Sequence, residues 1–334
     1  AWAAGLSLVL LEALADFGAV SILGVDTFST AIYKTWFGLY SLPAAAQLAC
    51  GVIGLVVLVL LLERWTRGRA SHASKQLMPP ARRPLRGWRG WAVTAAAAAT
   101  VGLGFVVPVA QLLAWSWQSR AALPDVGAPA LNTALLAAMA AGLVLAIALA
   151  FTLLGRRGGG DRIVQAAGFT AGLGYAVPGT VLAVGAMWLL VAAERAMPWL
   201  GGLALSSSLV AVLLALSVRF LRVGHEATES AFQSLRPSLL ESARVLGVPA
   251  GARLRRIVLP LLRPGLVAAL LLVIVETVKE LPATLMLRPF GWDTLAVRIY
   301  GYTTEGLWAE AAWPALWLCA VGLVPVWWLV RQQR

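Results

Sequence analysis

The 334-residue sequence predicts an all-α polytopic membrane protein with about eight transmembrane helices. Hydrophobic residues make up 60% of the chain and charged residues only 13%, whereas a soluble domain carries roughly a quarter charged residues. The apolar residues also come in blocks of about twenty, the length that a helix needs to cross a bilayer. The expected spans are 2–23, 42–63, 91–117, 131–154, 163–193, 204–221, 265–287 and 311–330.

The sequence marks some of these spans more distinctly than others. The run 131–154 contains no charged residue, so it is the clearest membrane helix. The opening run 2–23 is a span rather than a signal peptide, because it has no basic n-region and contains Glu12 and Asp16. Span 163–193 contains Pro178 and Gly179, a pair that favours a kink. That kink has two interpretations, a gate hinge or ordinary packing between membrane helices.

The net charge of +12 is distributed unevenly along the chain. Twenty-one of the 27 lysines and arginines fall on alternate loops, and five fall on the opposite loops: Lys34, Arg120, Arg195, Arg288 and Arg298. This asymmetry follows the positive-inside rule and predicts that segments 64–90 and 222–264 and the C-terminus are cytoplasmic. The basic charge is therefore a signal of topology, and it argues against a nucleic-acid partner.

The residues that build metal or nucleotide sites are scarce in this chain. Cys50 and Cys319 lie inside apolar spans, as expected of small buried hydrophobes. His72 and His225 both fall in cytoplasmic segments, so the spans offer no His/Cys metal site and no histidine-based catalytic site. No G-x-x-x-x-G-K-[ST] motif occurs, so we expect no P-loop, no bound cofactor and no enzymatic activity.

An internal repeat organises the chain. The stretch 8–19, LVLLEALADFGA, aligns with 272–283, LVIVETVKELPA, and TFSTAIY at 27–33 then aligns with TLAVRIY at 294–300. An apolar span and a charged end follow in both copies. We therefore expect residues 91–334 to be a complete six-helix unit, 64–90 a basic linker, and 1–63 the last two helices of an equivalent unit. Parallel repeats of six spans are a recurring plan among transporters.

A charged segment, 222–264, interrupts the apolar pattern of the second unit. Its centre predicts a short helix that begins near Pro237 and ends at a left-handed cap on Gly247, followed by a second, basic helix that ends near Pro260. Leu239, Ala243 and Leu246 share one face of the first helix by their spacing. Such a hairpin suits either contact with lipid phosphates or docking into a groove of a partner.

The sequence ESARVLGVPAGARLRRIVLP in this segment resembles the EAA loop of ABC importer permeases, whose pattern is E-A-A-x3-G-x9-I-x-L-P. The matching residues are Glu241, Ser242, Ala243, Gly247, Ile257, Leu259 and Pro260, and the single departure is serine in place of the middle alanine. The resemblance implies a type I importer permease fold in the bacterial inner membrane. It also implies that this loop docks on two cytoplasmic ATP-binding subunits, which hold the ATP and magnesium, with Leu259 and Pro260 turning the chain back to the membrane.

Nearly the whole chain resembles one branch, the fused two-module permeases of ferric-iron importers. KELPATLMLRPFGWDTLAVRIY is similar to the end of their second module, and ADFGAVSILGVDTFSTAIYKTWF to the end of their first. The resemblance implies alternating access, with substrate delivered by a periplasmic binding protein. Thiamine, an oxyanion or a polyamine is an alternative substrate, and an ion-driven secondary transporter is an alternative mechanism.

The first module departs from that branch because it lacks its opening spans and its own EAA loop. Residue 1 aligns with Gly265, so we expect either a sequence of the form G-x9-I-x-L-P just upstream or a partner that supplies the missing part.

Two acidic pairs lie inside the apolar runs. Glu12 and Asp16 are four residues apart, as are Glu276 and Glu280, so each pair shares one helical face. Ionisable groups in the membrane face a cavity or a partner, which suits a path for cations with Lys279 as a counter-charge. The alternative is that the acids lie near span ends and stabilise packing by hydrogen bonds, because Pro282 predicts a break just beyond Glu280.

Overall fold

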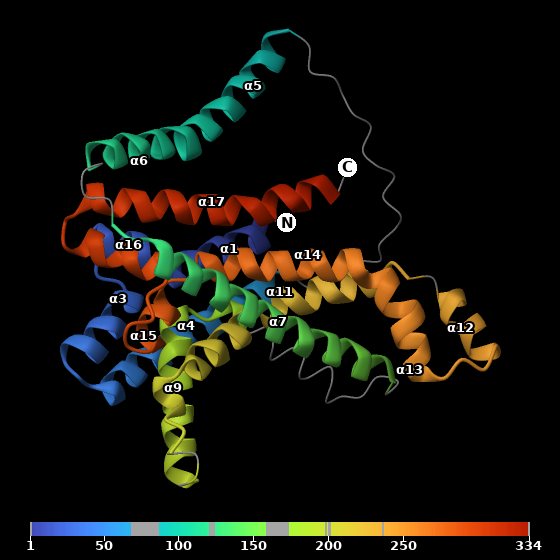
Figure 1. Ribbon diagram of the computed structural model, residues 1–334. Helices are drawn as coiled ribbons and strands as arrows, with labels where there is room; N and C mark the ends of the chain where they lie inside the picture. The colour runs from blue at the N-terminus through green and yellow to red at the C-terminus, as the bar shows by residue number, and fades with distance from the viewer. Residues whose placement is uncertain are drawn as a thin grey trace.

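The computed structural model describes residues 2–67, 87–119, 124–157, 174–197, 199, 202–235 and 237–332, and these ranges contain helices and no strand. Figure 1 shows the long helices lying side by side, with α12 and α13 at one end and α3, α15 and α16 at the other. We call these the hairpin end and the opposite end. Most of the linker 64–90, Arg120 and the first part of the span 163–193 lie outside the described residues.

Two sets of helices are joined by the linker. The first set is α1 (Trp2–Ala15), α2 (Gly18–Ile22), α3 (Phe28–Tyr33), η1 (Lys34–Gly38) and α4 (Leu42–Arg67). The second begins with α5 (Trp88–Val101), η2 (Gly102–Val106), α6 (Val107–Gln118), α7 (Gly127–Arg157), α9 (Gly179–Ala196), η4 (Leu205–Ser207) and α11 (Leu209–Gln233). It continues with α12 (Pro237–Val245), α13 (Ala250–Arg253), η5 (Leu254–Val258), α14 (Leu259–Val278), α15 (Pro282–Leu287), α16 (Leu295–Thr304) and α17 (Trp308–Gln332).

Six of the eight expected spans correspond to helices long and apolar enough to cross a membrane. The expected span 2–23 does not, because its helix stops at Ala15 and a short helix follows a break at Asp16 and Phe17. The expected span 204–221 does not either, because α11 carries its charged residues on the same continuous helix and runs on to Gln233. The membrane part of the described chain is thus less regular than the apolar runs predict.

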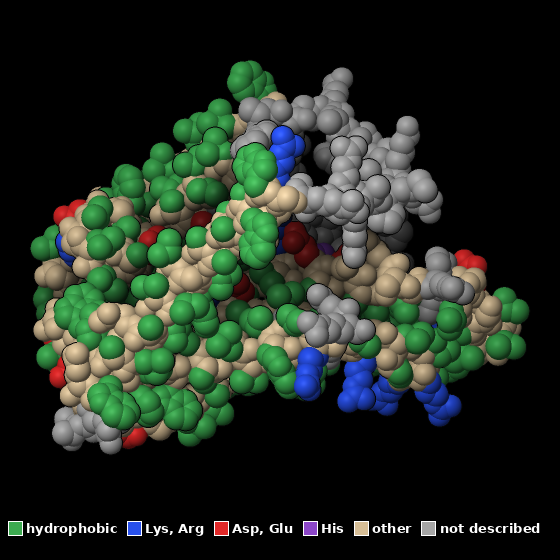
Figure 2. Space-filling view, turned by 90° about the horizontal axis from the view of Figure 1, so that it is seen from above, with side chains coloured by type: hydrophobic (Ala, Val, Ile, Leu, Met, Phe, Trp, Pro, Cys, Tyr) green, Lys and Arg blue, Asp and Glu red, His purple; other side chains and the backbone are tan. Residues whose placement is uncertain are grey.

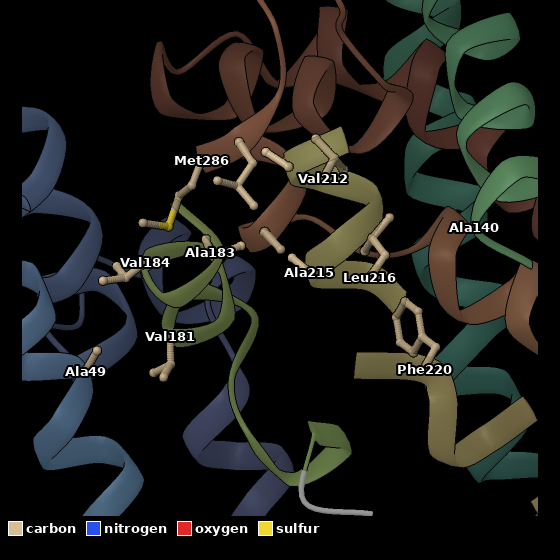
Figure 3. Close-up of a cluster of buried hydrophobic side chains, with 14 of the residues drawn as sticks. Ala49, Ala140, Val181, Ala183, Val184, Val212, Ala215, Leu216, Phe220 and Met286 are labelled. Atoms are coloured by element: carbon tan, nitrogen blue, oxygen red, sulfur yellow. The ribbon is translucent and has the colours of Figure 1, made fainter. Parts of the chain in front are cut away.

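Small residues allow the central helices to pack closely. α11 packs against α7, α14 and α9, and Figure 3 shows alanines and valines filling the space around α9 and α11. A Cβ atom on Gly224 of α11 would lie 2.6 Å from Cγ1 of Val144, so glycine is required for this crossing with α7. Close approach at small residues is the usual way in which membrane helices associate.

The helices α5 and α6 lie apart from this core (Figure 1). α6 packs on α17, and no residue of α5 is buried. The cysteines also differ from expectation, because Cys50 is exposed and Cys319 half-buried. In a bilayer such surfaces of the chain are covered by lipid or by other protein, so exposure here does not mean contact with water.

The order long helix, short helix, short helix, long helix occurs twice. α1 to α4 follow this order in residues 2–67, and α14 to α17 repeat it in residues 259–332. A threonine caps the second short helix in both copies: Thr27 forms a capping box with Thr30, and the side chain of Thr294 accepts from the N–H of Val297. The sequence alignment of 8–33 with 272–300 therefore matches helices that occupy the same place in this order.

Candidate functional site

A cavity of about 1220 Å³ lies between α1, α4, α11, α14 and residues 175–176. Figure 2 shows acidic side chains inside a hollow that is surrounded by hydrophobic surface. Six carboxylates line the cavity, and three basic side chains accompany them: Glu12, Asp16, Glu63, Glu226, Glu276 and Glu280, with Arg219, Arg222 and Lys279. The structure thus brings both predicted acidic pairs into one cavity.

Glu280 is buried and bonded to its surroundings. Its side chain accepts the backbone N–H groups of Ala283 and Thr284, each at 3.0 Å, and the hydroxyl of Thr284 at 2.9 Å. Nη1 of Arg219, on α11, lies 3.4 Å from Oε1 of the same carboxylate. These bonds cap the first turn of α15 and offset the cost of burying a charge. The expected break beyond Glu280 is therefore present, and this carboxylate stabilises it.

Asp16 occupies the equivalent place in the first set of helices. Its Oδ1 accepts the N–H of Ala19 at 3.3 Å, as Oε1 of Glu280 accepts that of Ala283. The two breaks also meet, because a Cβ atom on Gly18 would lie 3.6 Å from Cδ2 of Leu281. The repeat therefore places two equivalent helix breaks against each other.

Glu12 and Glu276 are more accessible than Glu280. The Glu276 carboxylate forms an ion pair at 3.0 Å with Lys279, whose side chain is 58% exposed, and Glu12 is exposed. Lys279 is thus the expected counter-charge of one acid of the cavity. Glu12 and Glu276 thus line the cavity as more accessible acids than the buried Glu280.

Pro178 does not line the cavity, but the chain breaks at this residue. The helix that holds Tyr175 is interrupted at 177–178, and α9 begins at Gly179. A Cβ atom on Gly179 would lie 2.3 Å from Nη1 of Arg219 and 2.6 Å from Oε1 of Glu280. The start of α9 therefore rests directly on the buried ion pair, so close packing requires glycine here.

The segment predicted to form a helical hairpin extends from the hairpin end (Figure 1). α12 begins at Pro237, and Gly247 ends it with φ +71°, as the predicted left-handed cap requires. Leu239, Ala243 and Leu246 line one groove of about 380 Å³ together with Ile257. Ala243 is buried in that groove, whereas Glu241 and Ser242 are exposed.

The boundaries of the segment differ from those predicted. Residues 222–233 continue α11, and the second basic helix does not end near Pro260, because the backbone stays helical from Ala250 through η5 into α14. Pro260 lies just after the π-helical turn η5, and π-turns and prolines are usual places for a helix to bend. The chain changes direction between α13 and α14 (Figure 1).

The model of the family described as binding-protein-dependent transport system inner membrane component matches residues 142–331, more than half of the chain. The chain belongs to this family. It is a multi-pass, all-α permease of the ABC importer class. The matched range contains the helical hairpin, α11, α14 to α16 and all but the last residue of α17.

Several relatives of the permease are named for the transport of different substrates. The Fe(3+)-transport system permease protein FbpB 2 of Haemophilus influenzae is 24% identical over 96% of this chain and 63% of its own length. A putative 2-aminoethylphosphonate transport system permease protein PhnV of Salmonella paratyphi A is 42% identical over 25% of this chain and 31% of its own length. The phosphate transport system permease protein PstA 2 of Mycobacterium bovis is 36% identical over 30% of this chain and 35% of its own length. The permease therefore spans less than two thirds of the length of these relatives.

Sequence reasoning missed several residues that line the permease cavity, among them Arg219 and Tyr175. Arg219 lies within the apolar run LLALSVRFL, and such an isolated charge indicates a partner inside the membrane. Tyr175 gave no signal, because only the fold brings the segment before Pro178 against α11.

Proposed function

We propose that the chain is the membrane-spanning subunit of an ATP-driven importer, in which the helical hairpin couples ATP hydrolysis on separate subunits to alternating access. The observation that carries the proposal is a hairpin with the EAA spacing at one end of a permease-family bundle. Val245 and Leu246 there are 88% and 79% exposed, an apolar surface suited to a partner. The expected partners are two cytoplasmic ATP-binding subunits and a periplasmic binding protein.

In this proposal the coupling residues divide into two roles. Glu241 and Ser242 are exposed and available to an ATP-binding subunit, whereas Ala243 is buried in the groove on the hairpin itself, which Ser242 and Ile257 also line. Gly247 ends α12, and Leu259 with Pro260 begins α14. The hairpin therefore combines a contact surface with a direct covalent connection to a helix that lines the cavity.

The test of coupling is co-purification of the full-length permease with its ATP-binding subunit. Leu246→Asp is expected to reduce both subunit binding and ATP-driven uptake at least tenfold, because it places a charge in the apolar contact. Leu39→Asp is the matched control, since Leu39 is 74% exposed beside η1 at the opposite end. Equal binding of the ATP-binding subunit by both variants and the unmodified protein would contradict the proposed coupling role.

We propose that the substrate is a cation, with ferric iron as the expected ion. The ferric-iron relative aligns with 96% of this chain, whereas the phosphonate and phosphate relatives align with a quarter to a third of it. Six carboxylates against three basic side chains also give the cavity a negative balance, which favours cations over oxyanions.

Uptake of radiolabelled ferric iron and of phosphate, each with the matching binding protein, tests the substrate. Glu12→Gln and Glu276→Gln are expected to lower iron uptake while the stimulation of ATP hydrolysis remains, because both acids face the cavity. Normal iron uptake by both variants would refute the cation path. Failure of ATP-driven uptake for every substrate would refute the importer itself.

The proposal includes a division of the chain and an orientation. Residues 1–63 would end a first permease module, 64–90 would be a cytoplasmic linker, and 91–334 would form a complete second module with its coupling loop at 222–264. Basic side chains gather at the hairpin end (Figure 2). The elements α13, η5 and the start of α14 contain Arg253, Arg255, Arg256 and Arg263, which supports a cytoplasmic position for this end.

A further inference from the structure

Aromatic side chains separate the acid-lined cavity from a second, smaller cavity at the opposite end. Phe17 lines the acid-lined cavity. Tyr33 and Tyr300 line the second cavity, which has a volume of about 400 Å³. The ring centroid of Phe17 lies 5.4 Å from that of Tyr33 and 5.5 Å from that of Tyr300. The three rings therefore fill the space between the cavities.

The barrier is closely packed at its centre. Phe17 is 2% exposed, and the Tyr33 and Tyr300 ring centroids are 6.2 Å apart in an edge-to-face arrangement. Burial raises the pKa of the Tyr33 phenol above its ordinary value, with the neighbouring Tyr300 adding to the effect, so Tyr33 is neutral at pH 7. An uncharged aromatic contact of this kind excludes hydrated ions, because it offers few polar partners to replace their water.

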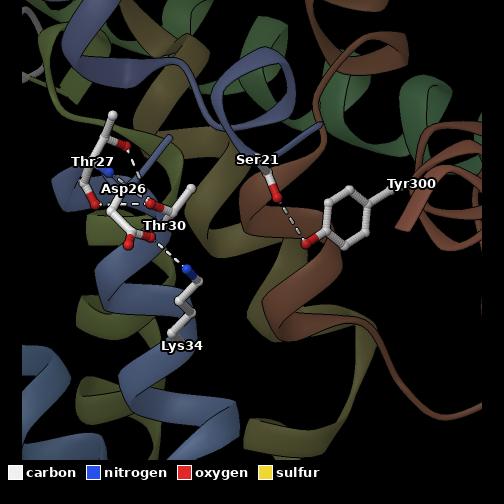
Figure 4. Close-up of polar contacts among 6 residues, drawn as sticks. All are labelled: Ser21, Asp26, Thr27, Thr30, Lys34 and Tyr300. Carbon is white, nitrogen blue, oxygen red and sulfur yellow. Dashed lines mark hydrogen bonds and ion pairs between the residues drawn. The ribbon is translucent and has the colours of Figure 1, made fainter. Parts of the chain in front are cut away.

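The residues of the barrier come from equivalent positions of the repeat. Tyr33 aligns with Tyr300, and Phe17 aligns with Leu281, which follows the buried Glu280 and lies against Gly18. A hydrogen bond of 3.2 Å between Ser21 and Tyr300 joins the two copies at this level (Figure 4). Any rotation of one set of helices against the other must therefore separate these contacts.

We infer that Phe17, Leu281, Tyr33 and Tyr300 form the gate that closes the acid-lined cavity towards the opposite end. This inference rests on the proposed transport function and adds the position of the barrier to it. Phe17 and Leu281 close the inner side of the gate, and the tyrosines close its outer side, where Arg288 and Asp293 line the second cavity.

Accessibility of a cysteine in the cavity tests the gate without ATP or substrate. The full-length permease would carry Cys50→Ala, Cys319→Ala and the reporter Leu272→Cys, because Leu272 lines the cavity and is 40% exposed. In membrane vesicles of both orientations, an impermeant thiol reagent is expected to reach this cysteine only from the side of the hairpin. Phe17→Ala with Tyr300→Ala is expected to raise the labelling rate from the other side at least tenfold.

Phe37→Ala is the matched control, because its ring is 5.1 Å from Tyr33 but it lines neither cavity. One-sided labelling that persists in the double variant, while labelling from the hairpin side stays normal, would overturn the gate. Equal labelling of the cavity cysteine from both sides, in the protein with an unmodified gate, would also overturn the inference. One-sided labelling in a protein that shows no ATP-driven uptake would refute the transport function and leave the barrier in place.

A cross-link covers the case in which the double variant does not fold. Ser21→Cys with Thr303→Cys, in the background without Cys50 and Cys319 and joined by a cleavable bifunctional thiol reagent, ties α2 to α16 beside the gate without replacing a gate residue. Uptake is expected to stop on cross-linking and to return when the linker is cleaved. Unchanged uptake after complete cross-linking would overturn the inference.

Discussion

Glu280 keeps its carboxylate inside the membrane domain because donors from two other elements meet it. Two backbone N–H groups and a hydroxyl from α15 and a guanidinium from α11 surround a side chain that is 2% exposed. Removing one partner of a buried ion pair leaves the other charge uncompensated, which costs more than losing an exposed pair. Substitution of Glu280 is therefore expected to reduce stability, whereas substitution of the more accessible acids of this cavity is expected to affect transport with little loss of stability.

Glu280→Ala is expected to destabilise the protein by about 3 kcal/mol, because Arg219 and the first turn of α15 both lose their acceptor. Glu276→Ala is expected to cost less than about 1 kcal/mol, because its partner Lys279 is 58% exposed and its charge remains solvated. Unfolding of the purified protein in detergent measures both changes. Equal losses would contradict the assignment of Glu280 to structure.

Gly179→Ala is expected to lower the unfolding temperature, because the new methyl group would lie 2.3 Å from Nη1 of Arg219 and 2.6 Å from Oε1 of Glu280. Gly185→Ala on the same helix meets no atom within 4 Å, so it is expected to be neutral or stabilising by up to about 1 kcal/mol. The same unfolding measurement compares the two. A neutral Gly179→Ala would mean that the ion pair can move away from α9.

At the scale of elements, the observed helix ends differ from the ends that the apolar runs of the sequence predict. Gly247 was predictable as a cap, since the basic helix that follows needs a turn after α12. The continuation of α11 past Arg222 was not, because a change from apolar to charged residues marks the edge of the bilayer and not the end of a helix. Likewise, no spacing rule pairs Arg219 with Glu280, 61 residues away.

Gly247→Ala is expected to weaken the coupling hairpin, because a residue with a Cβ atom at φ +71° loses about 1 kcal/mol. The stimulation of ATP hydrolysis by the permease should fall severalfold. Gly251→Ala, in α13 with open space around its Cβ position, provides the control and should leave stimulation unchanged. A loss of the same size in both variants would argue against a specific role for the cap.

At the scale of the whole molecule, the hairpin and the loop after α15 lie at opposite ends of the bundle (Figure 1). Each end presents a side chain that can be labelled: Val245 is 88% exposed, and Phe290, between α15 and α16, is fully exposed. The family match and the six apolar helices establish a multi-pass protein, and the distribution of charge predicts the orientation that we propose.

Val245→Cys and Phe290→Cys, each in a background without Cys50 and Cys319, are expected to react with an impermeant maleimide from opposite sides of the membrane. Val245→Cys should react in inside-out vesicles and Phe290→Cys in right-side-out vesicles, because the basic hairpin end is expected in the cytoplasm. Reaction of both from the same side would refute the assignment of the two ends.

The continuous helical path from the hairpin to the acid-lined cavity has a mechanical consequence. The apolar helix Gly251–Val278 has 28 residues and includes the π-helical turn η5. This helix bends between α13 and α14. Further along, Gly265 packs against Ala231 of α11, where a Cβ atom on Gly265 would lie 2.4 Å from Cβ of Ala231, and this close contact is a point about which the helix could pivot. If the hairpin couples ATP hydrolysis to transport as we propose, its displacement would pass to Glu276 and to the break at Glu280, because no loop separates them. Work done at one surface of the membrane would then reach the cavity as a rotation of this helix about its contact with Ala231.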